Sequence, residues 1–333
     1  MSARTLLDRF DAVLADLDGV VYAGPHAIPG AIDALAGLSG RGVGLAYVTN
    51  NASRTPAQVA AHLREIGAPA DDDQVVSSAQ AGAALLASRF PAGTRVLVTG
   101  SLALAQEVTA LGMAVVDSAH DNPDVVIQGF DPELGWADLA EATYAINAGA
   151  TWIATNTDMT IPRDRGMAPG NGTLVAAVRA AVGHDPLVAG KPEAPLFHTA
   201  AARLGARKPV VVGDRLDTDI LGGNNAGMAT ALVLTGVDSG ETALRARTEE
   251  RPQFIIDTLA QLYQPYPDIM HDGATVTCGA AAATVVDGGT TIRIDGDPAD
   301  SDAWRAACAA WWAAVPHAAE ATDPVLEWSN GHV

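Results

Sequence analysis

The sequence predicts an α/β protein built around a parallel sheet. Short apolar segments of strand length alternate with Ala-rich segments of helical period from the start of the chain, and 48% of the residues are hydrophobic against 18% charged. Such alternation is typical of βαβ units, whose helices cover both faces of the sheet. At 333 residues the chain has room for two domains, or for one domain with an insertion.

The first elements follow from apolar runs and capping residues. Residues 13–17 and 43–48 are predicted strands, and residues 31–38 between them are a predicted helix. Thr55 is the expected N-cap of the next helix, with Pro56 at its first position. Further strands are expected near residues 95–99, 124–128, 152–155, 209–213 and 229–234.

Changes in composition divide the chain into a core, an insertion and a tail. Residues 77–185 have their own strand–helix alternation and end in a Gly- and Pro-rich stretch, so we expect an inserted α/β domain there. The core then consists of residues 1–76 and 186–265. Residues 266–333 form a small α+β tail with a hairpin over 284–292 and a helix after it. The tail is small to stand alone and is expected to dock on the rest.

The tail helix carries an apolar face. Trp304, Cys308, Trp311, Trp312 and Val315 fall at helical spacing, behind Ser301 or Asp302 as N-cap. We interpret this stripe as a packing face rather than a ligand site. Cys278 and Cys308 are the only cysteines, and their spacing favours two buried free thiols over a disulfide framework or a thiolate zinc site.

Charge and hydropathy exclude several partners. With 20 Lys plus Arg against 39 Asp plus Glu, the net charge is −19, whereas nucleic-acid backbones and anionic membranes require basic surface. The apolar stretches are too short for a membrane helix, and the first residues do not resemble an export signal. We therefore expect a cytoplasmic protein with no nucleic-acid or membrane partner.

The strongest sign of function is Asp16-Leu17-Asp18-Gly19, directly after the first predicted strand. Parallel sheets bind ligands at the carboxyl ends of their strands, and residues two apart in an extended segment point the same way, so Asp16 and Asp18 can face one crevice. Two neighbouring carboxylates suggest a hard cation such as Mg²⁺, and Gly19 permits a sharp turn. Alone, the motif is also compatible with a polar turn that ends a strand.

Polar residues follow two further strands. Thr49 and Asn50 come after the second strand, where they can donate hydrogen bonds to a phosphoryl oxygen or form a loop that caps the next helix. Asp214 follows the buried strand of residues 209–213, at the place of a third acidic metal ligand. Asp219 is predicted to cap the following helix, or else to hold a metal-bound water.

Lysine is rare in this chain. Lys191 and Lys208 are the only lysines among 20 Lys plus Arg residues. Lys191 lies in the short segment Gly190-Lys191-Pro192, where an ammonium group on a flexible stem suits a phosphate, although a surface lysine is the simpler alternative.

The order of these motifs is more specific than any one of them. With Asp-x-Asp, Thr, Lys and Gly-Asp-x-x-x-x-Asp in succession, the sequence resembles the haloacid dehalogenase-like hydrolase superfamily. The segments DLDGVVY, VTNN, GKP and VGDRLDTDI resemble its branch with a large α/β cap, which includes phosphatases of glycerol 3-phosphate, phosphoglycolate, 4-nitrophenyl phosphate, pyridoxal phosphate and nucleotides. The resemblance covers residues 10–265 and implies a Rossmann-like parallel-sheet core, with the cap over 77–185.

The resemblance also implies the chemistry. Asp16 is the expected nucleophile, which forms an aspartyl-phosphate, and Asp18 is the expected general acid and base. Thr49, Asn50 and Lys191 are the expected ligands of the phosphoryl oxygens.

A metal completes the implied site. Mg²⁺ is expected on the Asp16 carboxylate, the Asp18 backbone carbonyl and Asp214, with Gly19 and Asp219 in an outer layer. Local cations of this kind would allow an acidic protein to bind an acidic substrate.

The cap is expected to exclude water and to contact the organic part of the substrate. Its candidate residues are Asn156, Asp158, Arg163 and Arg165, for each of which a solvated rim position is the alternative. The expected substrate is a small phosphomonoester, with glycerol 3-phosphate first and 2-phosphoglycolate second.

Other functions stay open. The same core chemistry serves phosphomutases and phosphotransferases, and a signalling protein can carry an aspartyl-phosphate without turnover. The tail is predicted to be a regulatory or dimerisation module, which makes a homodimer possible. It is also compatible with part of an acyltransferase-like fold, although no Gly-rich pyrophosphate loop is present.

Overall fold

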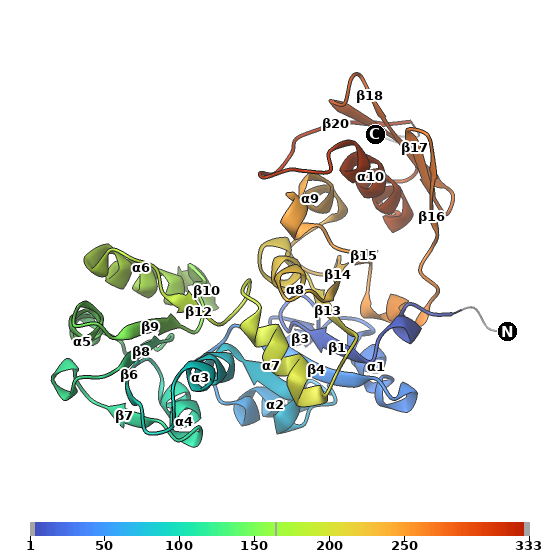
Figure 1. Cartoon of the computed structure of the whole chain (residues 1–333). Helices are drawn as coiled ribbons and strands as arrows, with labels where there is room; N and C mark the ends of the chain where they lie inside the picture. The colour runs from blue at the N-terminus through green and yellow to red at the C-terminus, as the bar shows by residue number, and fades with distance from the viewer. Residues whose placement is uncertain (1–3, 164, 330–333) are drawn as a thin grey trace. The chain divides into compact units, whose positions relative to one another are not determined.

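The computed structural model describes residues 4–163 and 165–329, and their contacts form two compact units. The first unit contains the described residues up to Leu45, Ile66–Pro69 and those from Ala206 on, whereas the second contains Ala46–Glu65 and Ala70–Gly205. The insertion predicted over 77–185 lies inside the second unit, whose limits are wider. Figure 1 shows the elements along the chain.

The first unit is built on parallel strands in the order β15-β14-β13-β1, which belong to a six-stranded sheet. Ala12 pairs with Pro209, and Leu14 with Val211. Every residue of β1 and β13 is buried, as expected for strands covered on both faces. The elements outside the tail are β1 (Ala12–Ala15), β2 (Tyr22–Ala23), β3 (His26–Ala27), α1 (Ala31–Ala36), β13 (Pro209–Gly213), α8 (Leu221–Asn225), β14 (Ala229–Val233), α9 (Gly240–Arg245) and β15 (Phe254–Ile256).

The second unit contains strands β4 and β5 of the same six-stranded sheet, paired in parallel, and a separate parallel sheet in the order β12-β9-β8-β6-β7. A β10–β11 hairpin completes it. Its elements are β4 (Gly44–Thr49, which starts in the first unit), α2 (Pro56–Glu65), β5 (Val75–Ser77), α3 (Ser78–Arg89), β6 (Arg95–Thr99), α4 (Leu102–Ala110), β7 (Ala114–Val116), β8 (Val125–Gln128), α5 (Trp136–Asn147), β9 (Thr151–Ala154), β10 (Thr160–Arg163), β11 (Gly166–Pro169), α6 (Asn171–Val182), β12 (Leu187–Val188) and α7 (Pro195–Leu204).

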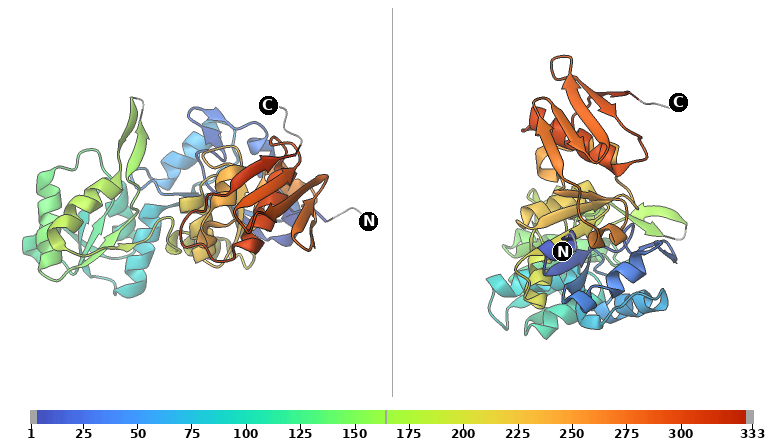
Figure 2. Two further views of the ribbon diagram at one scale, coloured as in Figure 1. Left: turned by 90° about the horizontal axis from the view of Figure 1, so that it is seen from above. Right: turned by 90° about the vertical axis from the view of Figure 1, so that its right-hand side faces the viewer.

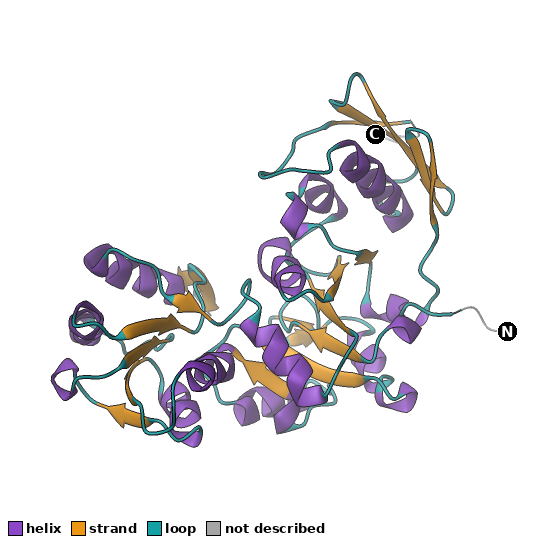
Figure 3. Cartoon of the chain, viewed as in Figure 1, coloured by secondary structure: helices purple, strands orange, loops and turns teal. Residues whose placement is uncertain are grey.

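The five-stranded sheet of the second unit is covered on both faces (Figure 3). Val96 and Ile127 pack with α3 and α4, whereas Leu97 and Val126 pack with α5 and α6. Neighbouring strand residues thus enter opposite cores, which is why these strands are apolar without alternation.

The predicted α/β class and the predicted strands are confirmed, with strand ends displaced by a residue or two.

The start of α2 is as predicted. The backbone N–H of Gln58 donates to Thr55 Oγ1 at 3.3 Å, and the backbone N–H of Thr55 donates to Gln58 Oε1 at 2.9 Å. These two bonds form a capping box. Pro56 is the first helical residue.

The tail adds a five-stranded sheet in the order β16-β17-β18-β19-β20, with one helix against it (Figure 2). The predicted hairpin is the antiparallel pair β18–β19, whereas β16, β17 and β20 were not predicted from the sequence. The elements are β16 (Ile269–Asp272), β17 (Thr275–Cys278), β18 (Ala281–Val286), β19 (Thr291–Asp295), α10 (Ser301–Ala314) and β20 (Val325–Trp328).

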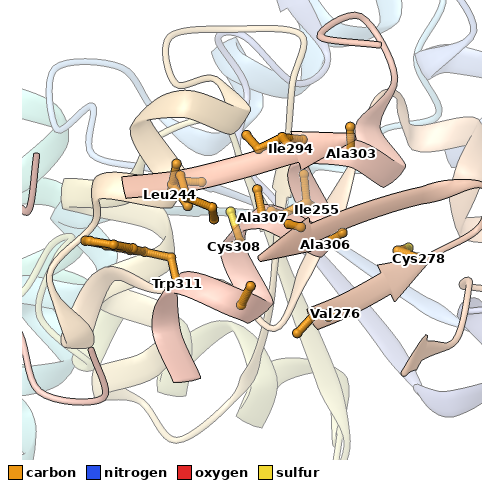
Figure 4. Close-up of a cluster of buried hydrophobic side chains, with 14 of the residues drawn as sticks. Leu244, Ile255, Val276, Cys278, Ile294, Ala303, Ala306, Ala307, Cys308 and Trp311 are labelled. Carbon is orange, nitrogen blue, oxygen red and sulfur yellow. The ribbon is translucent and has the colours of Figure 1, made fainter. Parts of the chain in front are cut away.

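The aromatic face of α10 is a packing face, as predicted. Cys308 and Trp311 are buried in one cluster with Leu244 and Ile255 of the preceding α/β part and Ile294 of the tail sheet (Figure 4). Both cysteines are free and buried. The tail therefore shares a continuous core with the elements before it, in agreement with the expected docking.

The N-cap of α10 differs from the prediction. Asp300, not Ser301 or Asp302, caps the helix, because its side chain accepts the Asp302 N–H at 2.9 Å. The Ser301 hydroxyl instead donates to Asp257 Oδ2 at 3.1 Å. Among the described helices, none is long and apolar enough to cross a membrane.

Candidate active site

The Asp16–Gly19 segment forms a tight turn at the end of β1. The Asp16 N–H continues the sheet by donating to Val212 O at 2.9 Å. The chain then reverses, because the Val21 N–H donates to Leu17 O and the Gly19 N–H donates to Tyr22 O, both at 2.8 Å. Gly19 has a φ of +77°, a conformation that favours glycine. The turn holds Asp16 half-buried at the carboxyl end of the strand.

Asp214 directly follows the neighbouring strand β13, and Asp219 lies in the helical turn after it; both are almost fully buried, at 2% and 0% exposure. Asp214 Oδ2 accepts the Val237 N–H at 2.8 Å, and Asp219 Oδ2 accepts the Arg215 N–H at 3.2 Å. The predicted capping role of Asp219 is wrong. Asp219 lies inside the helical turn Leu216–Ile220, which continues directly into α8, so its carboxylate binds the backbone before that turn instead.

Three carboxylates meet at this place. Ligand oxygens of Asp16, Asp214 and Asp219 all lie within 4.8 Å of one another, and the Asp18 carboxylate is not part of this group. So close a set of acidic groups is stabilised by a hard divalent cation with oxygen ligands.

Two glycines, Gly19 and Gly236, lie so close to Asp214 that a side chain at either position would collide with its carboxylate. A Cβ on Gly19 would lie 2.2 Å from Asp214 Oδ2, and a Cβ on Gly236 would lie 2.0 Å from the same atom. The donors present fit a metal such as Mg²⁺, because Asp16, Asp214 and Asp219 offer oxygen ligands within 4.8 Å of one another.

The loop after β14 also contributes to the site, although it was not predicted from the sequence. The Thr235 hydroxyl donates to Gly19 O at 2.6 Å, Gly236 packs beside Asp214, and Val237 supplies the N–H that binds Asp214. The available signal was a Thr-Gly pair directly after a predicted strand, at the edge where Asp16 and Asp214 also lie.

Arg215 is held by a neighbouring acid. Its Nε and Nη2 donate to the two carboxylate oxygens of Asp217 at 3.0 and 2.8 Å. This hydrogen-bonded pair raises the pKa of Arg215 above its usual value, despite partial burial.

The second unit holds the predicted phosphate-binding residues. Thr49 is the last residue of β4 and is nearly buried, and its Oγ1 accepts the Asn51 N–H at 3.1 Å. Lys191 is 4% exposed. The Asn50 side chain accepts the Lys191 N–H at 2.8 Å and donates to Lys191 O at 3.1 Å, so these two predicted residues are in direct contact.

Two of the predicted cap residues join this group. Asn50 Nδ2 donates to Asp158 Oδ1 at 3.0 Å, and Asn156 Nδ2 donates to Asn50 O at 2.7 Å. Arg165 is exposed, and the side chain of Arg163 lies outside the described residues.

Family comparisons agree with this geometry. A model described as haloacid dehalogenase-like hydrolase matches residues 13–114, and one described as HAD-hydrolase-like matches residues 188–262. The first match contains Asp16 and Thr49, and the second contains Lys191 and Asp214. The chain belongs to the haloacid dehalogenase-like hydrolases.

Particular relatives are phosphatases. The chain is 43% identical over 319 residues to D-glycerol 3-phosphate phosphatase of Mycobacterium tuberculosis, covering 93% of this chain and 88% of the relative. It is 39% identical over 237 residues to acid sugar phosphatase of Staphylococcus aureus, covering 71% and 90%.

Solved structures give the same result. Glycerol phosphate phosphatase of M. tuberculosis in complex with calcium matches with a TM-score of 0.86 and 40% identity, covering 98% of this chain and 95% of that chain. A 4-nitrophenylphosphatase from Thermotoga maritima matches with a TM-score of 0.72 and 33% identity, covering 78% and 99%. The match to the first of these includes the tail, whereas the second relative covers less of this chain.

Proposed function

We propose that this protein is a Mg²⁺-dependent phosphatase that hydrolyses glycerol 3-phosphate, with 2-phosphoglycolate as the second choice of substrate. The cluster of three carboxylates, Asp16, Asp214 and Asp219, carries the proposal. It supplies a nucleophile beside ligands for a divalent cation. The substrate follows from similarity across 93% of the chain, tail included, to the M. tuberculosis enzyme.

Hydrolysis would proceed in two steps. The Asp16 carboxylate attacks phosphorus, the ester P–O bond breaks, and Asp18 donates a proton to the departing glycerol oxygen. Asp18 then takes a proton from water, whose oxygen attacks the aspartyl-phosphate and releases inorganic phosphate. Each turnover consumes one water and restores both carboxyl groups to their starting states.

The other site residues would bind the metal ion and the phosphoryl group. Asp16, Asp214 and the Asp18 backbone carbonyl would hold the metal, with Gly19 and Asp219 behind them. When bound, the metal neutralises charge on the transferring phosphoryl group. Thr49 and Lys191 would hold the other phosphoryl oxygens. The metal and Lys191 would supply local positive charge for an acidic substrate in a chain of net charge −19.

The cap and the tail would have supporting roles. Residues 77–185 would exclude water and contact the organic part of the substrate, with Asn156, Asp158, Arg163 and Arg165 as the candidate contact residues. The tail would serve regulation or dimerisation.

The proposal is tested by phosphate release from glycerol 3-phosphate, 2-phosphoglycolate, pyridoxal phosphate, nucleotides and 4-nitrophenyl phosphate. We expect metal-dependent release that EDTA abolishes, with glycerol 3-phosphate the preferred substrate. Asp16→Asn should lower activity by at least about a thousandfold, because a side-chain amide is a far weaker nucleophile than a carboxylate. Asp33→Asn, a change at an exposed carboxylate of α1, is the matched control and should retain activity.

Other outcomes would identify the alternatives. Transfer of phosphate from one sugar phosphate to another without net release would indicate a phosphomutase. A stable aspartyl-phosphate on Asp16 without turnover would indicate a phospho-acceptor. Either result would contradict the phosphatase proposal.

A further inference from the structure

Asn50 uses all of its side-chain donors within the protein. A primary amide has two N–H groups, and those of Asn50 face Asp158 Oδ1 at 3.0 Å and Lys191 O at 3.1 Å. Its Oδ1 accepts the Lys191 N–H at 2.8 Å. No hydrogen of the side-chain amide is left to donate to a phosphoryl oxygen.

The orientation of this amide is determined by its partners. Rotating it by half a turn would place Oδ1 against two acceptors, Lys191 O and the Asp158 carboxylate, and Nδ2 against the Lys191 N–H. All three contacts would then be repulsive. The side chain therefore binds both backbone groups of Lys191, much as a neighbouring strand would.

The backbone of Asn50 is anchored as well. Asn50 O accepts the Ser78 hydroxyl at 2.6 Å and Asn156 Nδ2 at 2.7 Å, and both donors are almost fully buried. Asn156 Oδ1 in turn accepts the Asp158 N–H at 3.2 Å. Asn50 and Asp158 are thus held at both the main chain and the side chain.

The chain before Lys191 is closely packed against this arrangement. A Cβ on Gly190 would lie 2.5 Å from Asn50 Oδ1 and 2.5 Å from Thr155 O. Only glycine allows the segment to approach so closely, which brings the Lys191 backbone within reach of the Asn50 amide.

We propose that Asn50 is a positioning residue, whose side chain fixes the backbone of Lys191 and links it to Asp158 rather than binding the phosphate. Lys191 is 4% exposed, and both its backbone N–H and its backbone C=O are hydrogen-bonded to Asn50. The backbone from which the ammonium group extends is therefore fixed in position. This inference rests on the proposed function, in which Lys191 binds the phosphoryl group. Asp158 then contributes to the position of Lys191 indirectly, because it accepts a hydrogen bond from the Asn50 side chain.

The test uses the full chain with Asn50→Asp, which retains the size and the acceptor but replaces both donors. Two carboxylates would then face each other, and Lys191 O would lose the hydrogen bond from Asn50. We expect the KM for glycerol 3-phosphate and the inhibition constant for inorganic phosphate to rise together by about tenfold or more. The Mg²⁺ concentration for half-maximal activity should stay unchanged, because the metal ligands belong to the other unit.

Reversing the pair provides the rescue. In Asn50→Asp with Asp158→Asn, the new amide at 158 can donate to the new carboxylate at 50, so phosphate affinity should recover by at least about threefold over the single Asn50→Asp variant. Asn147→Asp, the same change at an exposed position of the same unit, is the control and should bind phosphate as the wild type does.

The outcomes are distinct. A variant that is merely less stable loses active enzyme and therefore kcat, with KM and the phosphate inhibition constant unchanged, and that result would overturn the inference. So would the absence of any recovery in the double variant. If Asn50→Asp does not fold, Asp158→Ala removes the link from its other end and must still raise the inhibition constant. A wild type that hydrolyses no phosphomonoester would instead overturn the proposed function, and the inference with it.

Discussion

Gly236 lies directly beside the carboxylate of Asp214. A Cβ on Gly236 would stand 2.0 Å from Asp214 Oδ2 and 2.6 Å from Asp214 Cβ, so no larger residue fits without moving the acid. The φ of Gly236 is outside the positive range, unlike that of Gly19. Space, not backbone freedom, therefore requires glycine at 236.

Gly236→Ala is expected to weaken metal binding. The added methyl group must displace the Asp214 carboxylate, which is buried and held by the Val237 N–H. We expect the affinity for Mg²⁺ or Ca²⁺, measured by calorimetry, to fall by about tenfold or more, with activity falling in parallel at limiting metal.

Gly40→Ala is the matched control for this change. A Cβ on Gly40 meets no atom within 4 Å, and its φ is also outside the positive range. Metal affinity should therefore equal that of the wild type. Equal affinity in Gly236→Ala would show that Asp214 does not hold the metal.

Thr235→Val is expected to loosen the turn that carries Asp18. The substitution retains the shape of the side chain but removes the hydroxyl that donates to Gly19 O at 2.6 Å. Loss of this bond should cost about 1 kcal/mol in the free energy of unfolding and lower kcat/KM by about fivefold. Thr235→Ser keeps the hydroxyl and should retain most of the activity. If the Val and Ser variants are equally impaired, the hydrogen bond is not the cause.

Arg305 is expected to be a major attachment of the tail. It is 6% exposed, donates to Ile255 O through Nε at 2.8 Å and Nη2 at 2.6 Å, and pairs with Asp302. Arg305→Met keeps the packing but leaves these acceptors without their donor, so the free energy of unfolding should fall by roughly 2–4 kcal/mol.

An exposed arginine of the same tail is the control. Arg293 pairs with Glu327, and both side chains are about half exposed. Arg293→Met should change the unfolding free energy by less than about 1 kcal/mol. Urea titrations of the two variants compare them, and similar losses would argue against Arg305 as a special attachment.

The buried cysteines predict a loss of stability in alkaline solution. Burial, and then the nearby Asp302 carboxylate, raises the pKa of Cys278 to about 12, and burial also raises the pKa of Cys308. The unfolded thiols lose their protons at lower pH than the folded ones, so the free energy of unfolding should decrease as pH rises above about 8.5. At neutral pH the native thiols should also react slowly with thiol reagents.

Urea titrations between about pH 7.5 and 9.5, below the tyrosine range, measure this effect. The variant with both Cys278→Ala and Cys308→Ala should be less stable at neutral pH, but its stability should decrease less with rising pH. An equal pH slope in both proteins would assign the alkaline loss to other groups.

Local patterns were sufficient for much of the fold. The apolar run before Asp16 predicts β1, and the Thr55–Pro56 pair predicts the start of α2, because periodicity and capping depend on residues close in sequence. The strands of the tail sheet were harder to predict. Strands β16, β17 and β20 are short and mixed in polarity, and they are specified by pairing with their neighbours and by α10.

The sequence by itself determined the class of the core, the motif residues after the strand ends, and the packing role of the tryptophan stripe. Only the tertiary structure decided that Gly236 and Thr235 belong with Asp214 and Gly19, and that the Asn50 amide serves Lys191 and Asp158. These partners are far apart along the chain, as Thr235 and Gly19 illustrate with a separation of 216 positions. A hydrogen bond or a close approach over such a separation leaves no periodic trace in one sequence, because it depends on where several loops meet.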